Sequence, residues 1–301
     1  MRNQPPSGTD DRLRAYQHDG LTFDVVDGGP LDGEAVVLLH GFPERASHWH
    51  DVSEVLHGQG LRTLAPDQRG YSPGARPSGR LAYRMTALVS DVVALIERYG
   101  APVHLVGHDW GAAVAWSTAA VRPDLVRTLT TVSVPHPAAF ARSLLSSDQA
   151  VRSLYVLAFQ PPGVVELVAR ALPGTVATLL RTTGLSPAEA ERFRAEIVDD
   201  GALPGALAWY RALPFSGRAA PGPVRVPTTH VWSDGDVALA RRGAELTADQ
   251  VRAPYQLRVL PGVSHWVPTQ AAAELADAIL DRVSTSPSRR EQTSRTRRVV
   301  T

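Results

Sequence analysis

Short apolar runs alternate with helix-like stretches along most of the chain, and this alternation constrains the fold more than any other feature. Each run ends at Gly, Pro or a polar residue, as buried strands do. Strands that alternate with helices predict an α/β protein with a mostly parallel, twisted sheet that is flanked by helices on both faces. The expected strands are 35–39, 60–65, 102–106, 125–134, 226–232 and 255–260, and the clearest helices are 85–99, 112–120 and 270–283.

The stretch 135–223 breaks this alternation. Its pattern is helical, and Pro and Gly interrupt it at 161–163, 173–174 and 204–205. A helical insertion into a series of strands predicts a separate lid, or cap, over the sheet.

The remaining residues then divide into two parts of one core, 11–134 and 224–283. Residues 1–10 and 284–301 are polar and show no periodicity, so we expect disorder at both ends. The C-terminal tail is basic, with five Arg and one Glu.

Composition excludes several classes of function. There is no Cys, which excludes disulfides, thiol catalysis and cysteine-ligated zinc. All 31 basic residues are Arg, so neither a Schiff-base lysine nor a P-loop lysine is available. The formal charge of +1 argues against a dedicated nucleic-acid binder. No apolar run approaches the roughly 20 residues of a membrane span. We therefore expect a cytoplasmic protein without nucleic-acid or membrane partners, and a homodimer remains open.

The strongest signal for chemistry is Gly107-His108-Asp109-Trp110-Gly111, which follows an expected strand and precedes an expected helix. This spacing is typical of a nucleophile elbow, in which two glycines allow a sharp turn and the middle residue is held above the sheet. Here the middle residue is Asp109 rather than Ser. A carboxylate nucleophile forms an ester, so the expected substrate carries a leaving group on an sp³ carbon. The alternative is an ordinary helix N-cap, a position that Asp often takes.

A second motif, His40-Gly41-Phe42-Pro43, ends the strand 35–39. Its turn could present the Phe42 N–H to the nucleophile, and a cis peptide before Pro43 would suit that turn. Together with the Trp110 N–H, this donor would form an oxyanion hole. A plain turn is the alternative.

His265 lies directly after the last expected strand and suits the role of a general base at neutral pH. A carboxylate at the end of strand 226–232 would orient it. Asp234 and Asp236 both fit this position. We favour Asp236, because Asp234 lies in the tight turn, where Asp commonly bonds its own backbone.

From about Leu21 to Val283 the chain resembles the α/β-hydrolase fold family, and within it the epoxide hydrolases. HGFP at 40–43 resembles the family's HGxP motif, and GHDWG at 107–111 resembles its nucleophile elbow. Asp236 and His265 match its acid and base, in the family's chain order. The resemblance implies a helical lid after the sixth strand of the sheet.

The family uses two lid tyrosines to bind and protonate the epoxide oxygen. Tyr155 and Tyr210 match them, because Tyr155 precedes a Phe-Gln-Pro-Pro-Gly-Val segment and Tyr210 lies in Leu-Ala-Trp-Tyr-Arg. The resemblance thus implies hydrolysis of a small apolar epoxide to a vicinal diol through an ester on Asp109, without a metal or an organic cofactor. Contacts to the substrate are expected from His40, Pro43, Phe159 and Trp266.

Two other functions remain open. A haloalkane dehalogenase shares the Asp elbow, and Trp110 could donate to a halide. That family usually has Asn where Phe42 stands, however, and paired tyrosines have no use in its chemistry. The other alternative is a non-catalytic ligand-binding homologue, against which the complete set of Asp109, Asp236 and His265 argues.

Overall fold

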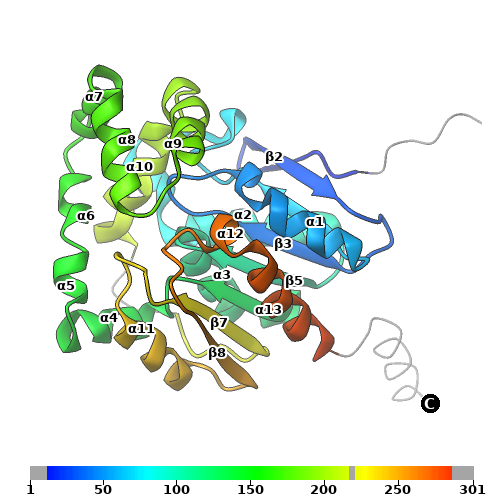
Figure 1. Cartoon of the computed structure of the whole chain (residues 1–301). Coiled ribbons are helices and arrows are strands. Elements are labelled where there is room, and N and C mark those ends of the chain that lie inside the picture. Colours follow the sequence, from blue (N-terminus) through cyan, green and yellow to red (C-terminus); the bar gives the residue numbers. More distant parts are fainter. Residues whose placement is uncertain (1–11, 217–220, 287–301) are drawn as a thin grey trace, which may run out of the picture.

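The computed structural model describes residues 12–216 and 221–286 (Figure 1). The disorder expected for 1–10 and for nearly all of 284–301 therefore concerns residues outside the described part. Within the described residues, none of the helices combines the length and the apolar character that a membrane span requires.

Eight strands of the described chain form one sheet in the order β1-β2-β4-β3-β5-β6-β7-β8. The first two strands pair antiparallel with each other, and β2 pairs antiparallel with β4, whereas every other neighbouring pair is parallel. The expected α/β class with a mostly parallel sheet is confirmed. The strands are β1 (Ala15–His18), β2 (Leu21–Gly28), β3 (Ala35–Leu39), β4 (Arg62–Pro66), β5 (Val103–His108), β6 (Val126–Val132), β7 (Thr228–Ser233) and β8 (Tyr255–Leu260).

The hairpin of β1 and β2 was not among the expected strands. It lies at the edge of the sheet, and its side chains alternate between buried and exposed positions instead of forming a continuous apolar run. The inner strands, such as β3, are buried along their whole length, which is why their apolar runs identify them.

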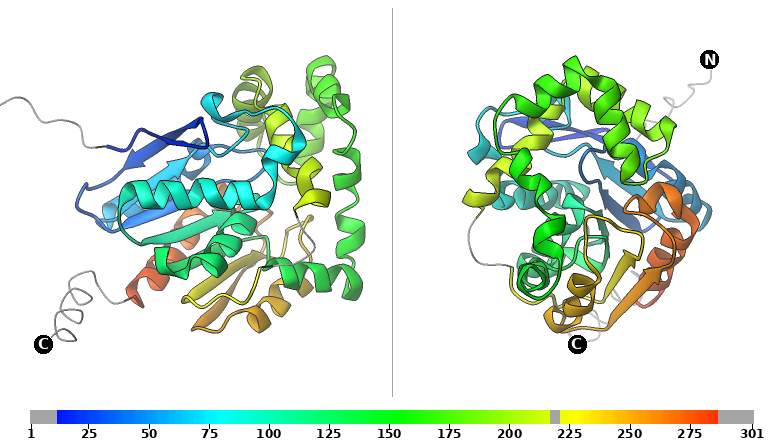
Figure 2. Two further views of the ribbon diagram at one scale, coloured as in Figure 1. Left: turned by 180° about the vertical axis from the view of Figure 1, so that it is seen from behind. Right: turned by 60° about the vertical axis from the view of Figure 1, so that its left-hand side comes forward.

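Helices cover both faces of the sheet and create two apolar cores (Figure 2). Alternate residues of β3 divide between them: Val37 packs with the helices α2 and α3, and Val36 packs with α1 and α13. The closing helix expected at 270–283 is broken into α12 and α13 at Ala271, whose φ of −140° is not helical. The helices of the core are α1 (His50–Gly58), α2 (Met85–Tyr99), α3 (Trp110–Val121), α11 (Arg241–Leu246), α12 (Val267–Gln270) and α13 (Ala272–Ser284).

Between β6 and β7 the chain forms a group of helices on one side of the sheet (Figures 1 and 2). Of these, α10 is buried on nearly all of its surface and carries Tyr210. It approaches the core closely, since a Cβ atom on Gly205 would lie 2.5 Å from the carbonyl oxygen of Gly70. The helices are α4 (Pro137–Ser146), α5 (Gln149–Arg152), α6 (Tyr155–Ala158), α7 (Val164–Ala171), α8 (Pro173–Thr182), α9 (Pro187–Phe193) and α10 (Leu203–Ala212), with a π-helical turn at Arg194–Asp199.

Candidate active site

Asp109 occupies the sharp turn between β5 and α3. Its φ of 51° and ψ of −120° lie in a region that residues other than Gly rarely adopt, so the surrounding fold must impose this conformation. The two flanking glycines are needed because the backbone is crowded: a Cβ on Gly107 would collide with the carbonyl of Gly111, and one on Gly111 with the carbonyl of Leu39. The turn therefore has the geometry expected from the Gly-x-Asp-x-Gly spacing.

Two groups face the carboxylate of Asp109. The backbone N–H of Phe42 donates to Oδ1 at 2.8 Å, and the peptide between Phe42 and Pro43 is cis. Nε2 of His265 lies 3.7 Å from Oδ2. Trp110 is the first residue of α3, where backbone N–H groups have no partner within the helix. Oδ1 is thus bound by the Phe42 amide, one of the two expected donors, and Oδ2 faces the imidazole.

His265 contacts Asp236 on its other side. Oδ2 of Asp236 lies 2.8 Å from Nδ1 of His265, while Oδ1 accepts hydrogen bonds from the amides of Ala238 and Leu239 at 2.8 and 2.9 Å. Both oxygens of this buried carboxylate are therefore occupied, and its orientation is fixed.

Asp234, the competing aspartate, does not reach the imidazole. Its Oδ1 accepts a hydrogen bond of 2.6 Å from the amide of Gly262. We expected Asp234 to bond its own backbone, and this was wrong. Its hydrogen bond with Gly262 instead joins the turn after β7 to the turn after β8.

In the group of Asp109, His265 and Asp236, the neighbouring charges shift the pKa values in the direction opposite to burial. Burial lowers the pKa of His265, but the charge of Asp236, the hydrogen bond to Asp236 and the charge of Asp109 raise it to well above its ordinary value. Burial raises the pKa of Asp236. The charge of His265 and the hydrogen bonds that Asp236 accepts outweigh this effect, so the pKa is lowered overall. The ring therefore lies between two carboxylates that both stabilise its protonated form.

A cavity of about 200 Å³ separates Asp109 from the helices above it. Tyr155 from α6 and Tyr210 from α10 line it together with Asp109, so residues distant in sequence share one space. Its wall is mostly apolar, and the remaining lining residues are Met85, Trp110, Ala113, Val134, Pro135, Pro137, Phe140, Gln149, Ser153, Val156, Leu213, Ala238 and Leu239.

The two tyrosines lie in an aromatic cluster. The ring of Tyr210 lies 5.1 Å from that of Trp110, 5.0 Å from that of Phe159 and 6.1 Å from that of Tyr155, measured between centroids. Burial raises the pKa of both phenols above the ordinary value, and the negative charge of Asp109 raises them further. Although 39% of Tyr155 is exposed, its hydroxyl is a neutral hydrogen-bond donor, as is that of Tyr210.

None of the four expected substrate contacts is among the side chains that line this cavity. Phe159 supports the tyrosines from behind, at 5.5 Å from Tyr155 between ring centroids. His40 is fully buried and its Nε2 accepts a hydrogen bond from the amide of Gln68 at 3.0 Å, so it lies behind the wall of the cavity.

The other two expected contacts also lie outside the wall. Trp266 packs its ring edge-to-face on His265 at 5.2 Å, and its indole N–H donates to Thr183. Pro43 lines a different, smaller cavity. The structure thus places all four side chains outside the lining of the 200 Å³ cavity, and their contact with a substrate stays a prediction.

Sequence reasoning missed most of the cavity wall, in particular Phe140 of α4, Gln149 of α5 and Leu239 after β7. Pro137 and Phe140 are three residues apart on α4 and so share one face of that helix, a spacing that could have identified them. Gln149 carries no such signal. Its side-chain oxygen accepts a hydrogen bond of 2.7 Å from the backbone amide of Ala240, which is distant in sequence.

The strand order, the aspartate in the turn after β5 and the histidine loop after β8 define a protein of the α/β-hydrolase fold. The chain belongs to the alpha/beta hydrolase family, whose model matches residues 36–278.

Individual relatives agree with this assignment. The chain is 34% identical to the AB hydrolase superfamily protein YfhM of Bacillus subtilis over 87% of its own length and 94% of that protein. It is 33% identical to epoxide hydrolase 3 of Xenopus tropicalis over 87% of its own length and 74% of that protein. The crystal structure of epoxide hydrolase A from Mycobacterium thermoresistibile superposes with a TM-score of 0.77 at 27% identity, covering 91% of this chain and 98% of that one.

Proposed function

We propose that this hydrolase is an epoxide hydrolase, which converts a small apolar epoxide to a vicinal diol. The observation that carries the proposal is that the Asp109 carboxylate and the phenols of Tyr155 and Tyr210 line one apolar cavity. An epoxide has a strained carbon to attack and an oxygen that leaves poorly, so it needs a nucleophile and a proton donor on opposite sides. The relatives named epoxide hydrolases support the same activity.

The first step forms an ester. Oδ1 of Asp109 is bound by the Phe42 amide, which leaves Oδ2 to attack an epoxide carbon. A bond forms between Oδ2 and that carbon as the carbon–oxygen bond of the ring breaks. One of the two phenols transfers its proton to the departing oxygen, and the other stabilises it by a hydrogen bond. The product is a hydroxyalkyl ester of Asp109.

The second step hydrolyses the ester. Esterification turns the Asp109 carboxylate into a neutral group, which removes one of the two charges that raise the pKa of His265. The imidazolium can then release a proton to solvent, and the neutral imidazole acts as a base towards water while Asp236 keeps its orientation. Water attacks Cγ of Asp109, and the negative charge develops on Oδ1. Phe42 and Trp110 stabilise this oxyanion, an effect of about 3 to 4 kcal/mol per donor.

Collapse of the tetrahedral intermediate breaks the bond between Cγ and Oδ2 and releases the diol. The imidazolium gives the proton taken from water to the leaving Oδ2, the acid proton that remains on Asp109 then passes to His265, and the phenolate regains its proton from solvent. One carboxylate oxygen of Asp109 now comes from water, and Oδ2 leaves with the product. No cofactor enters this balance.

Single-turnover hydrolysis of styrene oxide in ¹⁸O-labelled water tests the proposal. With enzyme in excess, the first diol should be unlabelled and the peptide that contains Asp109 should gain one ¹⁸O by mass spectrometry. A diol labelled in the first turnover would mean direct attack by water. Turnover of 1-bromobutane without turnover of styrene oxide would instead indicate a dehalogenase.

A further inference from the structure

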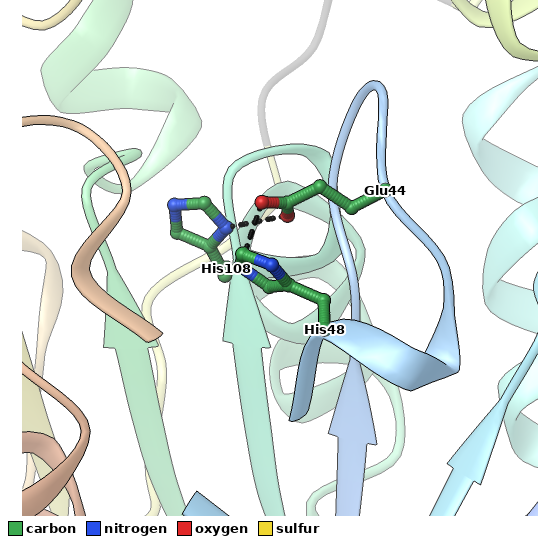
Figure 3. Close-up of side chains that lie close together, drawn as sticks. All are labelled: Glu44, His48 and His108. Carbon is green, nitrogen blue, oxygen red and sulfur yellow. Dashed lines mark hydrogen bonds and ion pairs between the residues drawn. The ribbon is translucent and has the colours of Figure 1, made fainter. Parts of the chain in front are cut away.

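A second polar cluster lies behind the active site and consists of Glu44, His48 and His108 (Figure 3). Glu44 follows the turn of Phe42, His48 belongs to a short 3-10 turn, and His108 ends β5 directly before Asp109. All three are at least nine-tenths buried. None of them lines the 200 Å³ cavity, and the proposed reaction uses none of them.

The side chains converge on one another from three separate segments. Oε1 of Glu44 lies 2.6 Å from Nε2 of His48, and Oε2 lies 3.0 Å from Nδ1 of His108. The two imidazole rings are nearly parallel, with 5.5 Å between their centroids. One ligand atom from each residue lies within 4.8 Å of the others, so a small adjustment would bring all three to a single ion.

The charge of Glu44 suits a cation. A carboxylate whose two oxygens face two imidazole nitrogens supplies the negative charge that a metal cation requires.

The far side of His108 has the partner that a ligating histidine usually has. Its Nε2 lies 2.9 Å from the backbone carbonyl oxygen of His265, which can only accept, so this nitrogen carries a hydrogen. Metal-bound histidines commonly donate their second N–H in this way. Nδ1, which faces Glu44, is then the ligand atom. Without a cation, a proton between Nδ1 of His108 and Oε2 of Glu44 is the competing occupant.

There is also room for a further ligand. A cavity of about 30 Å³ borders Glu44 and His48, and its wall also carries the acidic Glu189 and Glu196 and the basic Arg45 and Arg192. A space of this size accommodates one water molecule. Two imidazole nitrogens, one carboxylate oxygen and one water make the four ligands that Zn²⁺ prefers.

We propose that Glu44, His48 and His108 form a binding site for a divalent transition-metal ion, with Zn²⁺ the best match to these ligands. The ion would join the turn after β3 to the end of β5 and, through His108, to the loop of His265. Because the cluster is outside the substrate cavity, the ion would stabilise the arrangement of Asp109 and His265 and take no part in the chemistry. The site does not depend on the proposed reaction.

Titration of the full chain, stripped with EDTA and free of any affinity tag, tests the site. Calorimetry with ZnCl₂ should show one tight site per chain, with a Kd of about 1 µM or lower. Zn²⁺ should also raise the midpoint of thermal unfolding, because it binds only the folded state. Co²⁺ should give the intense visible absorption of a four-coordinate site.

His48→Gln removes one ligand, and we expect it to weaken Zn²⁺ binding about 100-fold and to abolish the Co²⁺ absorption. His50→Gln is the matched control, since His50 is an exposed histidine two residues away, and it should bind both ions like the parent protein. Both variants should retain diol formation in the absence of metal.

If His48→Gln does not fold, crystals of the parent protein soaked in ZnCl₂ still test the proposal. Anomalous scattering should place zinc among Glu44, His48 and His108. The proposal is overturned if zinc is found only elsewhere, if both variants bind it equally well, or if the parent protein does not bind it. The last result would mean that protons alone hold this cluster together.

Discussion

Oδ2 of Asp236 lies 2.8 Å from Nδ1 of His265, on the side of the imidazole ring that faces away from Asp109. The neighbouring Asp234 bonds the amide of Gly262 instead. Two aspartates that are two residues apart in sequence thus have different partners, and their substitution should have different effects.

Asp236→Asn should slow hydrolysis of the ester by orders of magnitude, because the imidazole loses the carboxylate that fixes its tautomer and stabilises its charge. Asp234→Asn should turn over normally and lose at most about 1 kcal/mol of stability, because Asn keeps an oxygen that accepts from the Gly262 amide but lacks the charge of the carboxylate. Single-turnover kinetics of the two variants would measure this. An ester that accumulates in Asp234→Asn and not in Asp236→Asn would reverse the assignment.

His265→Gln should form the ester and then stop. The base is needed only for the second step, whereas Asp109 and the two tyrosines are intact for the first. Mass spectrometry of the intact protein after incubation with styrene oxide should show the mass of one added substrate. Protein that stays unmodified would show that His265 is required for alkylation or for the fold.

Removal of both phenols should block the first step. Tyr155→Phe with Tyr210→Phe deprives the epoxide oxygen of its proton donors, and general acid catalysis is typically worth about 10² to 10⁴ in rate. Stopped-flow measurement of alkylation would detect this loss. Tyr255→Phe is the control, because its hydroxyl, in β8, has no hydrogen-bond partner among the described residues. Equal rates in the double variant and the control would exclude the tyrosines as acids.

The alkylation rate should stay constant through pH 10. An ordinary phenol has a pKa of about 10 and loses its proton there. Burial, followed by nearby negative charge, raises the pKa of both Tyr155 and Tyr210 above that value, so the neutral donors persist at higher pH. The measurement is the single-turnover alkylation rate of His265→Gln from pH 7 to 10.5. A fall with a midpoint near pH 10 would contradict the buried environment of the phenols.

Gly205→Ala should destabilise the protein by about 1 to 3 kcal/mol, because the added methyl group has no space beside the backbone of Gly70. It should also lower activity, since α10 carries Tyr210. Gly174→Ala in α8 is the control: no heavy atom lies within 4 Å of its Cβ, and Ala should stabilise the helix by about 0.5 to 1 kcal/mol. Urea unfolding of both variants measures the difference. Equal stabilities would mean that the α10 contact is adaptable.

Local sequence patterns were sufficient for the inner strands and for the turn of Asp109. A strand buried on both faces must be apolar along its whole length, and a turn as tight as that between β5 and α3 requires Gly107 and Gly111. Both requirements act within a few residues, so the sequence displays them directly. The edge hairpin of β1 and β2 has no such requirement, because one side of each strand is exposed.

The sequence by itself determined the class of fold, the position of the elbow and the residue types for carboxylate chemistry. Only the tertiary structure decided that His265 contacts Asp236 and not Asp234, that His40 lies behind the cavity, and that Glu44 meets two histidines. These outcomes depend on where loops from distant strands converge. Such convergence is set by the packing of the whole sheet and leaves no periodic signal in the segments that meet.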